Sequence, residues 1–156
     1  IMMLGDFAEF LQCLNKGERE KVSKALNMKV SYDTNYQLVA NALFTVKSLR
    51  NATAHNNIAF DTRFKDRDPN KNLIKWVEAE TGISNVKFEY FSEYIALIVC
   101  LLKHVQYPKR MLVKFLKEYE ECINDLYKEL PLPIYNKIVA TGIKGKLEKL
   151  NVYAKK

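Results

Sequence analysis

Apolar residues recur every three or four positions along most of the chain, which is the spacing of one helix face. Near the start this pattern predicts two short helices, one ending before Gly17 and one from Glu18 to Asn27. A longer helix follows, with Asp33 or Thr34 as its N-cap and an end near His55. We expect its buried stripe to contain Leu38, Val39, Ala42, Leu43, Val46 and Leu49.

A loop and a short helix are expected in the middle of the chain. The segment 56–72 loses the apolar period and mixes both charge signs, which indicates a loop. Within this segment, Asp68 and Pro69 have the residue types of an N-cap and a first helical position. They predict the start of a short helix that stops near Gly82.

Two long helices are expected in the second half, one from Phe88 to about His104 and one from Pro108 to about Leu130. The prolines of the sequence LPLP break the second of these, and a short helix from Ile134 precedes a lysine-rich tail. The sequence contains no strand alternation, internal repeat or low-complexity segment. We therefore predict an all-α fold, a helical bundle, with residues 1–156 as a single domain.

The composition is that of a globular protein. Hydrophobic residues make up 48% and charged residues 28% of the chain, a balance found in folded domains rather than in disordered or fibrous chains. The longest apolar run, from Tyr94 to Leu102, is half the roughly 18 residues of a membrane span. We expect this run to be a buried helix and the protein to have no membrane as a partner.

The cysteines and the first residues bear on where the protein works. Cys13, Cys100 and Cys122 are widely spaced on apolar helical faces, which predicts reduced core thiols in a cytoplasmic protein. No CxxC or paired-His spacing occurs, so neither a metal ion nor another cofactor is expected. The opening IMMLGDF lacks the cationic flank of a secretory signal, and the first residue is Ile1. We expect the chain to be a part of a longer product.

The net charge of +7 is unevenly distributed along the sequence. From Lys103 to Lys117 five residues are Lys or Arg and none is Asp or Glu, and the segment from Lys137 to Lys156 holds six Lys and one Glu. Such stretches attract phosphate backbones, but they are equally typical of solvated helix faces. The charge is therefore compatible with a nucleic-acid partner without identifying one.

One stretch, SLRNATAHNN at 48–57, carries a chemical signal. The sequence has no Gly-rich phosphate loop, HExxH motif or nucleophile elbow. Within the stretch, Asn51 and His55 are four residues apart and share a helix face. Arg50 is offset from His55 by about 140° and must lean around the helix to meet them.

These three residue types suit RNA cleavage. A neutral imidazole accepts the proton of a ribose 2′-hydroxyl, its protonated form donates one to the leaving 5′-oxygen, and a guanidinium binds the charge that develops on the phosphate. Asn51 would orient the imidazole or donate to a phosphate oxygen. Because the 2′-hydroxyl is the nucleophile, no metal ion is needed. One histidine per chain would have to act as both acid and base. We therefore expect a symmetric dimer that brings two copies of the stretch together.

Two other interpretations stay open. An Arg followed five residues later by a His arises by chance, and a His at a helix end can bind the last carbonyl groups. The stretch would then be a structural cap in a non-catalytic module that binds RNA or a protein partner. His104, between an apolar helix and Pro108, is interpreted as such a cap and is not part of the predicted site.

The sequence LRNATAH, 49–55, resembles the Arg-x4-His motif of HEPN ribonucleases. It has Asn after the Arg and Ala before the His, the form found in bacterial abortive-infection proteins of the Abi family (AbiD/AbiF-like). The opening MMLGDFAEFLQCL, with its Gly5-Asp6-Phe7 turn into a helix, and the closing LPLPIYNKIVATGI are similar to segments of the same proteins. The resemblance implies a HEPN-like helical domain over residues 1–156 as the C-terminal part of a longer protein.

The resemblance also implies a function. It makes this chain a metal-independent endoribonuclease of a phage-defence or toxin-antitoxin system, with RNA as substrate, an antitoxin as a further partner and a homodimer with facing motifs. By position in the motif, the catalytic residues are Arg50, Asn51 and His55.

The loop after the motif is expected to touch flanking RNA. Arg63, Lys65 and Arg67 supply positive charge there, although a solvated loop explains them equally well. Many relatives have a basic residue and an aromatic soon after the His, whereas here the segment 56–59 intervenes before Phe60. This departure concerns the substrate-contact surface more than the catalytic pair.

Overall fold

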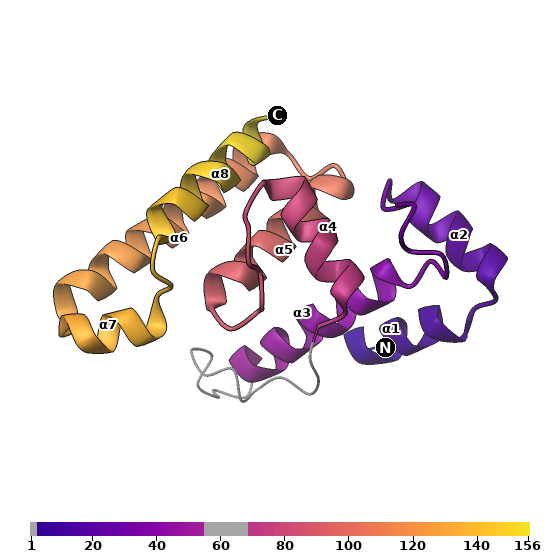
Figure 1. Ribbon diagram of the computed structural model, residues 1–156, viewed down its shortest axis with the longest axis horizontal. Coiled ribbons are helices and arrows are strands. Elements are labelled where there is room, and N and C mark those ends of the chain that lie inside the picture. Colours follow the sequence, from indigo (N-terminus) through magenta and orange to yellow (C-terminus); the bar gives the residue numbers. More distant parts are fainter. Residues whose placement is uncertain (1–2, 55–68) are drawn as a thin grey trace. The chain divides into compact units, whose positions relative to one another are not determined.

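The computed structural model describes residues 3–54 and 69–156, and every regular element in these ranges is an α-helix (Figure 1). The all-α fold class is therefore confirmed. The helices are α1 (Leu4–Cys13), α2 (Lys16–Ala25), α3 (Leu38–Ala54), α4 (Lys71–Thr81), α5 (Phe91–His104), α6 (Lys109–Glu129), α7 (Leu132–Ile138) and α8 (Ile143–Lys155).

The chain divides into two compact units, with the boundary inside α4 between Trp76 and Val77. The first unit contains α1, α2, α3 and the start of α4, and the second contains the end of α4 and α5 to α8. Each unit is a packed set of helices. The expectation of a single HEPN-like domain stays a prediction.

In the first unit, α1 packs along α3. Gly5 lies against the side chain of Lys47, whereas Leu11 shares a small cavity with Val39. Since early residues of α1 meet late residues of α3, the two helices are antiparallel. The beginning of α1 therefore lies beside the end of α3 that carries Arg50.

The start of α3 is fixed by Asp33. Its carboxylate accepts hydrogen bonds from the backbone N–H groups of Gln37 (3.2 Å) and Leu38 (2.8 Å). Asp33 therefore caps the helix, as the sequence predicts, but it does so across an intervening turn. The expected stripe is largely correct, because four of its members are buried and Leu43 and Val46 are half-buried; the buried ones are Leu38, Val39, Ala42 and Leu49.

The start of α4 differs from the expectation. The helix begins at Lys71 rather than at Pro69, and the side chain of Asn70 accepts a hydrogen bond of 2.8 Å from the backbone of Asn72. Asn70 thus satisfies an N–H group of the first turn, a role that Asp68 was expected to play. The predicted end is confirmed, since Gly82 follows the helix with a φ of +70°, a conformation that glycine adopts without strain.

The second unit is built around α5, in which eight residues are buried. The lysine-rich C-terminal segment packs on this unit as α8 and is not a tail, so the expectation of a tail is wrong. Burying a leucine or isoleucine side chain stabilises a fold by roughly 1.5–3 kcal/mol. Of the lysines of α8, Lys146 is half-buried and pairs with Glu93, whereas Lys144, Lys149 and Lys155 are exposed. The buried stripe of α8 is formed by Ile143, Leu147, Leu150, Tyr153 and Ala154.

Two of the three cysteines also differ from the expectation of core thiols. All three are free, but Cys13 and Cys122 are exposed and only Cys100 is buried. Cys13 belongs to the side of α1 that carries the exposed Asp6 and Glu9, so apolar neighbours in the sequence did not place it in the core. None of the helices in the described ranges combines the length and the apolar character needed to cross a membrane.

Candidate active site

The described end of α3, residues 49–54, is the platform of the candidate site, and buried side chains hold it in place. Leu49 and Ala52 are buried and anchor the turn in the first unit. The hydroxyl of Thr53 donates to the carbonyl oxygens of Leu49 (3.2 Å) and Arg50 (2.9 Å) in the preceding turn. The described part of α3 extends to Ala54, and the predicted end near His55 lies outside the described residues.

Arg50 and Asn51 meet on this turn. The guanidinium Nη1 of Arg50 donates a hydrogen bond of 3.1 Å to the side-chain oxygen of Asn51. Arg50 is exposed and Asn51 is half-buried, so the less mobile amide orients the longer side chain. Arg50 leans toward Asn51, as helix geometry predicts. Within residues 3–54 and 69–156, no carboxylate pairs with Arg50.

This arrangement leaves the guanidinium able to bind an anion. Arg50 has five N–H donors, and the bond to Asn51 uses one of them. The remaining donors include a fork that matches two oxygens of a phosphate.

The other predicted site residues, His55, Arg63, Lys65 and Arg67, lie outside the described residues. Of the predicted catalytic set, the structure therefore brings Arg50 and Asn51 together. The roles assigned to all of these residues stay predictions.

Lys47 is a further basic residue of this platform that sequence reasoning missed. It precedes Arg50 by three positions and Asn51 by four, so the three residues share one side of α3. Its side chain is half-buried and crosses Gly5 of α1. Gly5 was the available signal, because a glycine in the first turn of an amphipathic helix often marks a close approach.

His104 takes part in a different cluster, in the second unit. Its Nε2 lies 3.4 Å from Oε2 of Glu80, and the hydroxyl of Tyr153 donates to the same oxygen at 2.8 Å. The neighbouring thiol of Cys100 is buried, and burial raises its pKa, which makes it a poor nucleophile. The cluster joins α4, α5 and α8 and therefore has a structural role.

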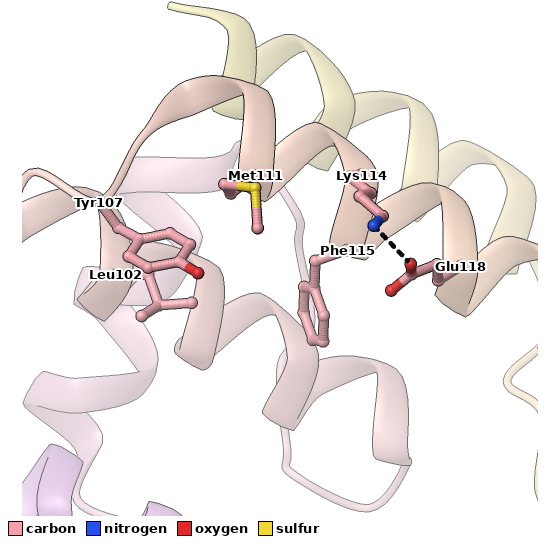
Figure 2. A pocket seen from close by; sticks show the side chains of 6 residues that line it. All are labelled: Leu102, Tyr107, Met111, Lys114, Phe115 and Glu118. Atoms are coloured by element: carbon pink, nitrogen blue, oxygen red, sulfur yellow. Dashed lines mark ion pairs between the residues drawn. The ribbon is translucent and has the colours of Figure 1, made fainter.

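A shallow apolar groove of about 300 Å³ lies between the end of α5 and α6 (Figure 2). Figure 2 shows the rings of Tyr107 and Phe115 on either side of Met111, with the ion pair of Lys114 and Glu118 (3.7 Å) at one edge. RNA cleavage needs a base, an acid and a phosphate-binding group that converge, and this lining does not offer them. The groove is therefore not the candidate active site.

No three His, Cys, Asp or Glu side chains gather closely enough to hold a metal ion in the part of the chain that the structure describes.

Comparison of the chain with protein families, with curated proteins and with solved structures finds no match in any of the three. The functional argument therefore rests on the residues of the motif and on the geometry of α3.

Proposed function

We propose that this chain is a HEPN-type endoribonuclease of the Abi family that acts in phage defence or in a toxin-antitoxin system. The observation that carries the proposal is the hydrogen bond between Arg50 and Asn51 on the last turn of α3, because His55 is the next residue after that helix. A polar amide, a guanidinium that pairs with no carboxylate of the described residues, and an imidazole thus belong to one short segment of chain.

The proposed reaction is attack of a ribose 2′-hydroxyl on the adjacent phosphate. The neutral imidazole of His55 accepts the 2′-hydroxyl proton while the 2′-oxygen forms its bond to phosphorus. The bond from phosphorus to the 5′-oxygen then breaks, and a protonated imidazole donates a proton to that oxygen. The products are a 2′,3′-cyclic phosphate and a free 5′-hydroxyl.

Arg50 is assigned the phosphate. Negative charge accumulates on the phosphate oxygens as the 2′-oxygen bonds to phosphorus, and a forked guanidinium binds two of these oxygens at once. Asn51 keeps the guanidinium in place through the bond of 3.1 Å. Because the nucleophile belongs to the RNA itself, the reaction needs no metal-activated water.

We further propose that the active form is a homodimer. One His55 per chain must otherwise serve as base and as acid, whereas two copies supply one imidazole for each role. Sedimentation at micromolar concentration is expected to show twice the chain mass of 18.2 kDa. A strict monomer that still cleaves RNA would contradict this part of the proposal.

The assignment to the Abi family also implies a cellular location and partners. The protein would work in the cytoplasm, on RNA, under the control of an antitoxin partner that keeps it silent. Arg63, Lys65 and Arg67 would bind phosphates that flank the cleaved one, because they follow the motif in the sequence.

A modified substrate tests the mechanism. Single-stranded RNA and the same RNA with 2′-deoxy nucleotides at the cleaved positions are incubated with the protein and EDTA. We expect the first to be cut to a 2′,3′-cyclic phosphate and the second to stay intact at those positions. Equal cutting of both substrates would exclude the mechanism, and RNA binding with no cleavage would instead identify a non-catalytic RNA-binding module.

A further inference from the structure

Lys47 is a half-buried cation three residues before Arg50 on α3, and within the described ranges it makes no ion pair. Its Nζ lies 5.9 Å from the centre of the Phe44 ring, near the outer limit of a cation–π contact. Partial burial of an ammonium group carries a desolvation cost that a surface lysine avoids. A bound anion would offset this cost.

Gly5 makes room for this side chain. A Cβ atom at Gly5 would lie 3.0 Å from Cε, 3.2 Å from Cδ and 3.3 Å from Nζ of Lys47. All three distances are below ordinary van der Waals contact. Gly5 is also helical, and alanine is more favourable than glycine inside a helix by roughly 0.5–1 kcal/mol. The missing methyl group thus leaves a cradle for Lys47 at some cost to α1.

The position of Lys47 fits a chain of phosphates better than a single anion. The Nζ of Lys47 lies 5.9 Å from the centre of the Phe44 ring, whereas Nη1 of Arg50 bonds to the side chain of Asn51 at 3.1 Å. The two cations thus reach toward residues that are seven positions apart on α3, an axial separation of about 10 Å between those backbone positions. This arrangement suits neighbouring phosphates of one strand that runs along α3.

We propose that Lys47, seated over Gly5, binds the RNA phosphate next to the one that Arg50 contacts. This inference rests on the proposed function and adds to it a second phosphate position, nearer the middle of α3 than the one at Arg50.

The test measures RNA binding separately from cleavage. A fluorescent 2′-O-methyl RNA keeps its phosphates but lacks the nucleophile, and its affinity for the full chain is measured over a range of salt concentrations. Lys47→Met is expected to weaken binding several-fold at low salt. It should also reduce the slope of log affinity against log salt by about 0.7, the value for one phosphate contact to a single strand.

Gly5→Ala is the sharper variant, because it leaves the charge of the chain unchanged. The added methyl should displace the flexible end of Lys47 and weaken binding by a similar factor, while the melting temperature stays the same or rises. The double variant should bind no more weakly than Lys47→Met alone, since the two changes remove the same contact between Lys47 and the phosphate. Lys21→Met is the matched control, because Lys21 is exposed in the same unit and its ion-pair partner among the described residues is Glu18, at 2.8 Å.

The outcomes separate this inference from the function on which it rests. If Lys47→Met binds as well as Lys21→Met while Arg50→Ala binds more weakly, the Lys47 contact is excluded and the RNA site stands. If Lys47→Met weakens binding but Gly5→Ala does not, Lys47 binds the phosphate without needing the space that Gly5 leaves. If the wild type does not bind the RNA, both proposals are excluded.

Discussion

The carboxylate of Asp33 lies 2.8 Å from the backbone nitrogen of Leu38 and accepts its hydrogen bond. Asp33 is only 4% exposed, so water does not replace this bond easily. The contact fixes the first turn of α3, the helix whose last turn carries Arg50 and Asn51. A buried carboxylate at one end of the helix therefore supports the candidate site at the other.

Removing this carboxylate should destabilise the first unit. Asp33→Ala is expected to lower the free energy of unfolding by about 1–2 kcal/mol, the usual loss for a helix cap. Asp33→Asn keeps one acceptor oxygen and should lose less. Thermal melting followed by circular dichroism measures the effect, with Thr34→Ala as the control because Thr34 is the exposed next residue. Equal melting of Asp33→Ala and the control would show that the bond contributes nothing.

Glu93 should be the most sensitive carboxylate of the second unit. Its side chain is 3% exposed, accepts from the backbone of Lys87 (3.2 Å) and Glu89 (3.0 Å), and pairs with Lys146 at 3.0 Å. Glu93→Ala leaves a cation and two N–H groups without their acceptor, and breaking such a pair costs about 3–5 kcal/mol. Urea unfolding measures this loss.

The control for that experiment is Glu148→Ala, which removes an exposed glutamate of α8. It should leave the urea midpoint unchanged. If both variants unfold at the same urea concentration, the buried ion pair does not hold α5 and α8 together as the geometry indicates.

Buried tyrosines should make the protein sensitive to alkali. Burial raises the pKa of Tyr94, Tyr119 and Tyr153 above their usual value near 10. Because the folded-state pKa is the higher one, their contribution to stability is complete below pH 10 and is lost as the pH rises through the folded values. Lys103, whose pKa burial lowers, acts in the opposite sense, whereas the Cys100 thiol, whose pKa burial raises, acts in the same sense as the tyrosines.

Tyrosinate absorbance tests this directly. Of the nine tyrosines, these three should ionise only when the chain unfolds, and the urea midpoint should fall between pH 8 and pH 11. Ionisation of all nine in a chain that remains folded would contradict the prediction.

Much of the fold was predictable from the apolar period alone. That period identifies α1 to α6, and the end of α4 follows from Gly82. It does not identify the neighbour that covers each face. Cys13 and Cys122 therefore proved exposed, and α8 was missed because its lysines hid the stripe that includes Leu147 and Leu150.

The candidate site was predictable only in part. Helix geometry gave the lean of Arg50 toward Asn51, which depends on residues adjacent in sequence. The contact between Gly5 and Lys47 joins two helices, so it depends on how α1 packs on α3 and no local pattern reveals it.

The central claim is that Arg50 and His55 cleave RNA without a metal ion. The direct measurement is the rate of single-stranded RNA cleavage in EDTA by the wild type, Arg50→Ala, His55→Ala and the control Lys21→Ala. We expect each of the two site variants to lose at least about 100-fold in rate, as is usual when an acid, a base or a charge-stabilising donor is removed. The control should match the wild type. Cleavage that continues unchanged in both Arg50→Ala and His55→Ala would contradict the assignment.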